Sequence, residues 1–326
     1  MKKKSVLLLL VLIFLLTAAV NFGAAAAYRQ RNMQSYLAAS IDKQARLSEL
    51  QGKRIILVGG SNVAFGFKSD LIEEATGRAT MNMGLQGSLG LRFMLNSLKP
   101  YLRQGDTVLL SPEYNNFAME FVGGDVLAQY LIISPQEIRY LSSPQEMLNI
   151  VSTLPNVHSS AIQSMMDDYL KDGCFLCSSE ETVYYRQGFD QYGDVTVNRG
   201  GLGKDVPPLK VTPNHAASIT RQMIRVLNDF TEYTAKNGIK VYLVYPATSA
   251  AADQATVDFL RELDGKLRSE LKMPILGTMS ESEFPNEYMF NTSYHLNSVG
   301  AVIHSEQVIH WLCGADAELT CGNAGR

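Results

Sequence analysis

The apolar positions of the chain form one long N-terminal run and then many short runs separated by amphipathic stretches. From residue 53 onward, short runs rich in Val and Ile alternate with longer stretches whose apolar residues recur at helical spacing. This pattern is typical of βαβ units around a mostly parallel sheet. It predicts five strands, at residues 54–59, 79–83, 107–111, 240–245 and 274–276. The helices predicted between and after them are residues 69–76, 89–103, 216–237, 253–271 and 298–312.

The alternation stops between residues 118 and 214, where Pro-containing turns replace most strand signals. Two short helices are predicted in this stretch, at residues 136–142 and 144–152. Long insertions in α/β domains commonly form lids or binding surfaces. We therefore expect an α/β domain made of residues 53–117 and 215–313, a largely helical and irregular insertion that covers or binds the substrate, and a C-terminal tail at residues 314–326.

The N-terminal run has the composition of a membrane-spanning segment, since it follows three lysines and 20 of the first 27 residues are apolar. Residues 5–27 are long enough to cross about 30 Å of hydrocarbon. They form either an uncleaved anchor or a signal peptide cut near the alanines at 24–27. The length of the run favours a single-pass anchor in the cell membrane, and the lysines place the C-terminal domain outside the cytoplasm. Residues 28–52 are predicted to form a stalk or an entry helix.

The amino-acid composition and charge favour some classes of function over others. The chain has 326 residues, of which 46% are hydrophobic and 19% charged, so it is expected to fold. Without the three N-terminal lysines it carries 26 Lys+Arg against 32 Asp+Glu. An acidic outer domain argues against nucleic-acid binding and favours a neutral sugar hydroxyl or a small ester over a polyanion.

The four cysteines form two local pairs. Cys174 and Cys177 lie in an irregular stretch, and Cys313 and Cys321 flank the start of the polar tail. Outside the cytoplasm two local disulfides are favoured, since no second CxxC completes a zinc site. A thiol-redox role for Cys174 and Cys177 is the alternative. No metal site is predicted.

Two residues are the first candidates for chemistry. Ser61 directly follows the strand at 54–59, at the sheet edge where ligands bind in open α/β folds. GGSNVAFG lacks the GxGxxG spacing, so no dinucleotide site is predicted, but Ser61 can also be an ordinary turn or capping residue. His295 lies in a polar loop before the last helix, where it is either a general base or a helix cap.

Four segments resemble, in order, the motifs of the SGNH (GDSL-like) hydrolase and acyltransferase superfamily: GGSN at 59–62, MNMGLQG at 81–87, LLSPEYNNF at 109–117 and YHLNSVG at 294–300. The resemblance implies a flavodoxin-like three-layer sandwich with a mostly parallel five-stranded sheet and no cofactor. It also implies Ser61 as nucleophile, His295 as base, and an oxyanion hole formed by the backbone of Ser61 and Gly84 and the side chain of Asn115.

The chain departs from the family pattern in two motifs. The third has no Gly-x-Asn, so Asn115 is only the nearest match by character, and Glu113 in the same motif can instead contact substrate or the base. In the last motif, the aspartate expected before the histidine is replaced by Asn291. An asparagine can orient the imidazole but offers no negative charge, and the Asp-to-Asn change in a serine protease costs about 10⁴ in kcat.

A narrower resemblance is to a membrane-anchored bacterial branch of the superfamily, which is often linked with O-acylation of cell-surface polysaccharides. The segments that carry this resemblance are PEY, FDQYGD at 189–194 and YHLN. Alginate acetylation proteins and the teichoic-acid D-alanine transfer protein are more distant relatives of this kind. The resemblance implies an acyl esterase or O-acyltransferase acting on a cell-surface glycan or small ester, with a membrane-embedded acyl-donor protein as a further partner. The alternative is a catalytically silent glycan-binding or assembly protein.

Overall fold

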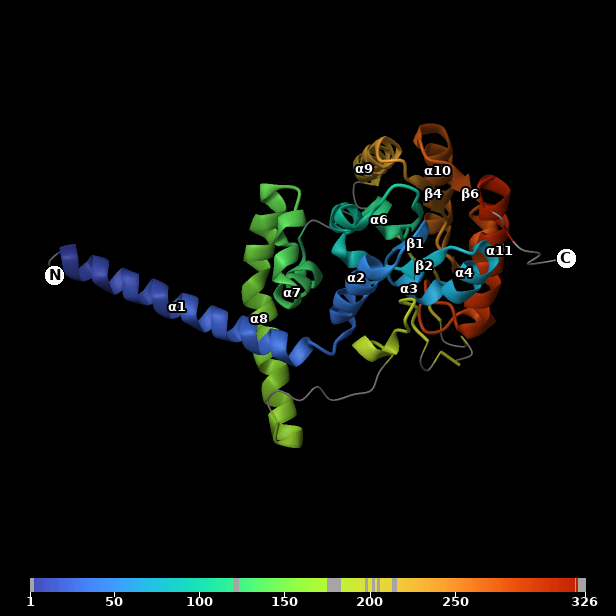
Figure 1. The fold of residues 1–326 in the computed structure, drawn as a ribbon. Coiled ribbons are helices and arrows are strands. Elements are labelled where there is room, and N and C mark those ends of the chain that lie inside the picture. Colours follow the sequence, from blue (N-terminus) through green and yellow to red (C-terminus); the bar gives the residue numbers. More distant parts are fainter. Residues whose placement is uncertain are drawn as a thin grey trace.

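The computed structural model describes residues 3–119, 123–174, 183–196, 199–200, 203, 206–212, 216–319 and 321. Figure 1 shows three parts: the N-terminal helix α1 (Lys3–Asn32), a pair of helices that crosses its C-terminal end, and an α/β domain. The pair consists of α7 (Asp125–Ile133) and α8 (Pro144–Asp172).

The α/β domain is built on a five-stranded sheet in the order β2-β1-β3-β4-β6, and all four strand pairs are parallel. The strands are β1 (Arg54–Gly59), β2 (Ala79–Asn82), β3 (Thr107–Ser111), β4 (Lys240–Val244) and β6 (Ile275–Leu276). They lie where the pattern of apolar runs predicts them, which confirms an α/β domain with a mostly parallel sheet. A second sheet pairs β5 (Thr248–Ser249) with β7 (Glu283–Phe284) and is not predicted, because two-residue strands show no periodicity.

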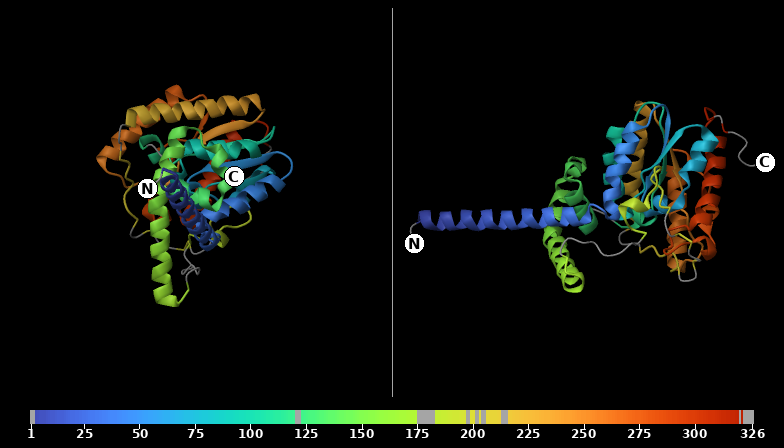
Figure 2. Two further views of the ribbon diagram at one scale, coloured as in Figure 1. Left: turned by 90° about the vertical axis from the view of Figure 1, so that its left-hand side faces the viewer. Right: turned by 60° about the horizontal axis from the view of Figure 1, so that its bottom comes forward.

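Helices cover both faces of the main sheet (Figure 2). Ile55 and Leu57 of β1 belong to the apolar cluster on one face, and Ile56 and Val58 to the cluster on the other, as side-chain alternation along a strand requires. The helices of the first face are α3 (Ser61–Gly66), α4 (Ser69–Thr76) and α11 (Ser298–Ala315). Those of the second are α2 (Ala39–Glu49), α5 (Leu91–Leu98), α9 (Ala216–Lys236) and α10 (Gln254–Glu270).

The predicted helix at 89–103 is shorter than expected. Gly90 has φ +85°, a left-handed conformation that favours glycine, and α5 begins only after it. Pro100 lacks a backbone N–H, and the chain leaves the α-helix as a 3₁₀ turn at Lys99–Tyr101. Of the other helices predicted in the α/β domain, α4 has the predicted bounds, and α9, α10 and α11 differ from the prediction only at their ends.

The insertion contains more helix than the pattern predicts. The helix predicted at 144–152 continues to Asp172, through Pro155. Ile150 and Val157 keep helical spacing across this proline and are both buried, so packing outweighs the hydrogen bond that Pro155 cannot donate. The predicted helix at 136–142 is a 3₁₀ segment, Pro135–Tyr140. Helix α7 is not predicted, because its sequence DVLAQYLII is apolar on nearly all sides.

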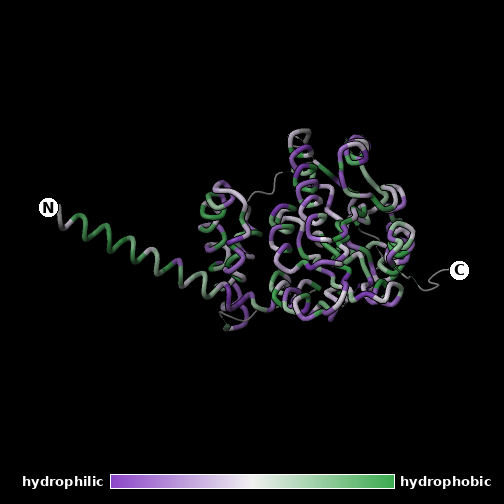
Figure 3. The backbone as a smooth tube through the Cα atoms, turned by 45° about the horizontal axis from the view of Figure 1, so that its top comes forward, coloured by the Kyte–Doolittle hydropathy of each residue, from purple (hydrophilic) through white to green (hydrophobic). Residues whose placement is uncertain are grey.

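Residues 28–52, between the anchor and the sheet, are divided among three elements rather than forming one helix. The first of these residues continue α1 to Asn32, and the rest form a 3₁₀ turn, Tyr36–Ala38, and then α2. Leu47 of α2 is fully buried in the core of the domain. Within α1, residues 5–32 are long and apolar enough to cross a membrane, which agrees with the predicted single-pass anchor (Figure 3).

The C-terminal tail is tied to the domain by a disulfide. Cys313 in α11 is bonded to Cys321, with 6.1 Å between their Cα atoms, as the spacing predicts. Cys174 is also disulfide-bonded, whereas Cys177 lies outside the described residues. The buried Asp316 accepts a hydrogen bond of 2.6 Å from Lys240 at the start of β4.

Candidate active site

Ser61 and Glu113 meet at the carboxyl edge of the sheet. Gly59 of β1 pairs in register with Ser111 of β3, so the residues that follow these two strands emerge side by side. Ser61 begins α3 and lies on the wall of a cavity of about 350 Å³. The side chains that line this cavity are Tyr36, Ser61, Gln86, Tyr184, Thr292, Tyr294 and His295.

His295 is held in one orientation by two neighbours. Its Nδ1 lies 2.8 Å from Oδ1 of Asn291 and 3.3 Å from the hydroxyl of Tyr184. The Tyr184 hydroxyl also accepts a hydrogen bond of 2.8 Å from Nδ2 of Asn291. Because the Oδ1 atom can only accept, this network places the imidazole proton on Nδ1 and leaves the lone pair of Nε2 for another partner.

The imidazole is buried and neutral. Its ring stacks on Phe65, with 4.1 Å between ring centroids and 7° between planes. Burial, and secondarily the positive charge of Arg199, lowers the pKa of His295 from 6.5 to about 3. The imidazole therefore accepts protons weakly compared with an exposed histidine.

The hydroxyl of Ser61 points to a carboxyl group. Its Oγ donates a hydrogen bond of 3.2 Å to Oε1 of Glu113, and the backbone N–H of Asn62 lies 3.4 Å from the same oxygen. Burial raises the pKa of Glu113. Within the described part of the chain, no hydrogen bond joins Ser61 to His295, although both line the same cavity.

Two glycines make room for Glu113. A Cβ atom at Gly60 or at Gly87 would clash with the Glu113 carboxyl group, and one at Gly60 would also press on the backbone nitrogen of Gly87. The carboxyl group therefore occupies a space walled by backbone, next to the nucleophile candidate.

The structure does not bring two of the expected oxyanion donors to the cavity. The backbone N–H of Gly84 donates a hydrogen bond of 2.8 Å to Oδ1 of Asn82, so it is already engaged. Asn115 begins the short helix α6 (Asn115–Ala118) and is not among the residues that line the cavity. The backbone N–H groups of Ser61 and Asn62 both donate to Glu113.

A buried network holds the loop that carries Gly84. The ammonium of Lys43, from α2, donates to the carbonyls of Asn82, Gly84 and Gly193 at 3.0, 2.5 and 2.7 Å. Asp194 accepts a hydrogen bond of 2.7 Å from the side chain of Asn82. Burial opposes both charges: it lowers the pKa of Lys43 to about 7 and raises that of Asp194 to about 6.

Sequence reasoning missed Tyr184, Arg199, Asp194 and Lys43. Only two of them leave a signal in the sequence. Asp194 ends the FDQYGD segment, and Lys43 falls at helical spacing between Ala39 and Leu47 on the buried side of α2. A lysine in such an apolar row points to buried carbonyl partners.

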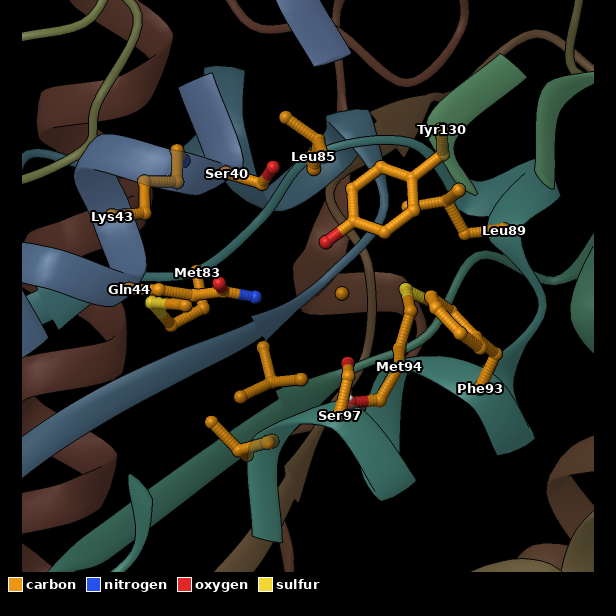
Figure 4. Close-up of a pocket in the computed structure, with 13 residues that line it drawn as sticks. Ser40, Lys43, Gln44, Met83, Leu85, Leu89, Phe93, Met94, Ser97 and Tyr130 are labelled. Carbon is orange, nitrogen blue, oxygen red and sulfur yellow. Dashed lines mark hydrogen bonds between the residues drawn. The ribbon is translucent and has the colours of Figure 1, made fainter. Parts of the chain in front are cut away.

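A second, smaller cavity lies behind the loop (Figure 4). It measures about 50 Å³ and is lined by α2, α5, α7 and the segment around Leu85. The side chain of Tyr130 projects into it from α7, with Met94 and Ser97 of α5 on another wall. This volume holds a water molecule or two, so of these two cavities only the one beside Ser61 and His295 is large enough for a substrate.

Comparison with known proteins identifies no family. No protein-family model matches the chain, and no curated protein matches it. Among the described residues, no three His, Cys, Asp or Glu side chains are grouped to hold a metal ion. A functional assignment therefore rests on the four sequence segments and on the geometry around Ser61.

Proposed function

We propose that the protein is a membrane-anchored serine acyl esterase or O-acyltransferase with an SGNH-like fold, acting outside the cytoplasm. The observation that carries this proposal is that Ser61 and a neutral His295, oriented by Asn291, line one cavity at the carboxyl edge of a parallel sheet. The strand order supports the fold assignment, because it is the flavodoxin-like order 2-1-3-4-5. The choice of a cell-surface glycan as acyl acceptor rests on the family resemblance.

The proposed reaction has two acyl transfers. Oγ of Ser61 attacks the ester carbonyl of the donor while Nε2 of His295 accepts the hydroxyl proton, and the collapsing intermediate expels the alcohol, which takes that proton. Water or a sugar hydroxyl then attacks the acyl-serine and loses its proton to Nε2 of His295, and the collapsing intermediate expels Oγ of Ser61, which takes that proton back. A transferase needs an acyl donor outside the cytoplasm, which we propose a membrane-embedded partner protein supplies.

Glu113 enters this reaction as a neutral acid. An ionised carboxylate beside the forming oxyanion would raise the barrier, whereas a protonated one can donate its O–H to that oxygen. Enzymes do use a buried carboxylic acid kept neutral for this purpose. Burial favours the neutral form of Glu113, and release of the Ser61 and Asn62 backbone N–H groups would supply two further donors.

Glu113→Gln is expected to acylate at least as fast as the wild type. The glutamine amide provides a neutral N–H donor in the same position, so the loss of rate that the wild type shows as pH rises through the raised pKa of Glu113 disappears. The rate of ester hydrolysis across pH measures this. A loss of more than about tenfold at every pH would instead assign Glu113 as the base that activates Ser61.

Labelling with a fluorophosphonate probe tests the nucleophile. The Ser61 Oγ is expected to form a bond to phosphorus with loss of fluoride, and Ser61→Ala is expected to abolish the labelled band. Ser269→Ala, an exposed serine on α10, is the matched control and should label like the wild type. A folded wild-type protein that never labels, with or without Asn291→Asp, would refute the proposed catalysis.

A catalytically silent glycan-binding or assembly protein is the second candidate. It is favoured by the resting contacts of the site, in which the Ser61 hydroxyl is bonded to Glu113 and the Gly84 N–H to Asn82. This candidate predicts saturable binding to polysaccharide that Ser61→Ala leaves unchanged, together with no labelling of Ser61.

A further inference from the structure

Helix α8 exposes a stripe of large apolar side chains. Among the described residues, seven on this helix are large, apolar and exposed to between 36% and 76%: Met147, Leu148, Val151, Ile162, Met166, Tyr169 and Leu170. At 100° per residue they fall on one side of the helix, with Pro155 between them. A soluble surface rarely carries such a patch without a partner.

The other sides of α8 have different environments. Ile150, Val157 and Ala161 are buried and form the packing side, which faces α7 and the rest of the insertion. Exposed polar residues such as Ser160 and Asp167 lie on a third side, more than a quarter turn from the centre of the apolar stripe. The helix is thus amphipathic on its exposed surface as well as packed against the protein.

Contacts with α1 show which way the stripe points. His158 falls on the same side of α8 as the apolar stripe but is buried, and its Nδ1 lies 3.1 Å from Oδ1 of Asn21 in α1. On the opposite side of α8, Ser164 accepts a hydrogen bond of 3.0 Å from Arg31, which also pairs with Asp168. Asn21 precedes Arg31 along α1, so the apolar stripe lies on the side of α8 nearer the N-terminal half of α1. The α/β domain lies on the other side (Figures 1 and 2).

The position on α1 at which α8 crosses it corresponds to the boundary of a bilayer. Residues 5–23 of α1 are exposed, and the first contact with the rest of the protein is that of Asn21 with His158. At 1.5 Å per residue, residues 5–23 span about 28 Å, close to the thickness of a hydrocarbon core. Helix α8 therefore crosses α1 where the membrane-spanning part ends.

An apolar groove extends the same surface. It lies between α1, α7 and α8, has a volume of about 1030 Å³, and includes Phe22, Ala25, Leu131 and Leu154 among its walls. Arg29, at the end of the span, also lines it. A groove of this kind at the membrane edge fits a lipid acyl chain.

We infer that α8 lies in the outer interface of the bilayer that α1 spans, with its apolar stripe among the lipid chains and its polar side in water. The inference rests on the anchor assignment in the proposed function. An interfacial helix buries an apolar face at the boundary of headgroups and acyl chains. Because Lys171 is the only Lys or Arg of α8, the helix is expected to insert through apolar burial and to bind phosphatidylcholine, which is zwitterionic and carries no net charge.

Tryptophan fluorescence tests this placement in the full-length protein, reconstituted into phosphatidylcholine vesicles. The chain has one tryptophan, Trp311, so Trp311→Phe gives a silent background. In it, Ile162→Trp places the reporter on the apolar stripe and Ser160→Trp, nearly half a turn away, is the matched control. We expect lipids brominated on their acyl chains to quench Ile162→Trp at least about twofold more strongly, with blue-shifted emission.

Equal quenching of the two reporters would overturn the inference. Blue-shifted emission at Ile162→Trp without quenching would also overturn it, because it would mean that protein covers the stripe. As a second variant, Ile162→Gln with Met166→Gln is expected to reduce quenching of a Leu148→Trp reporter and to leave fluorophosphonate labelling of Ser61 unchanged. Loss of labelling in every variant, with quenching as expected, would count against the proposed catalysis and leave the placement of α8 intact.

Discussion

His295→Ala is expected to slow acylation of Ser61 by at least about 10³-fold, because among the described residues that line the cavity no other group can take the hydroxyl proton as readily as Nε2. The rate constant for fluorophosphonate labelling and the turnover of a small ester measure the loss. His304→Ala is the matched control. His304 is also buried with a pKa lowered to about 4, but its Nδ1 bonds the carbonyl of Gly66, and it is not among the residues that line the cavity.

The pH dependence gives the same prediction a second readout. A base is active above its pKa, and the pKa of His295 is lowered to about 3, so protonation of His295 should not reduce the rate between about pH 7 and about pH 5. Asn291→Asp places a negative charge beside Nδ1, and it is expected to raise the rate and shift the acid limb to higher pH. An acid limb near pH 6.5 in the wild type would contradict the buried, neutral imidazole.

Asp106→Ala is expected to destabilise the protein by about 3–5 kcal/mol. Asp106 and Arg54 are both fully buried and paired at 2.6 and 3.0 Å, and Arg54 also donates to the carbonyl of Leu47 at 2.6 Å. Removing the carboxylate leaves a charged guanidinium without its counter-ion between strand, loop and α2. Urea denaturation followed by circular dichroism measures the free energy of unfolding.

Glu262→Ala is the control for this measurement. Its carboxylate pairs with Lys266 on the exposed surface of α10, where water screens the charges, and the midpoint of unfolding should not change. An Asp106→Ala protein that unfolds at the wild-type midpoint would show that the buried guanidinium is compensated in another way.

The sheet was predictable from sequence because parallel strands that are buried on both faces consist of short, nearly continuous runs of apolar residues. Ser61 and Glu113 could be placed together for a related reason, since both follow such strands at the same edge. The contact of Tyr184 with His295 could not, because it joins an irregular part of the insertion to a loop 111 residues away. The hydrogen bond from the Gly84 N–H to Asn82 could not be predicted for a different reason. It depends on the side-chain rotamer of Asn82, which the spacing of residues in the sequence does not determine.

The three hydrogen bonds from Lys43 to backbone carbonyls determine where a protease can cut the chain without disturbing the candidate active site. A protease that released the domain by cutting between α1 and Tyr36 would leave α2, and with it Lys43, attached to the domain. A cut between α2 and β1 would sever the peptide link of this lysine to the sheet and leave only side-chain contacts to keep the 82–84 loop in place. Shedding from the cell surface and retention of a competent site are therefore compatible only when cleavage falls on the membrane side of α2.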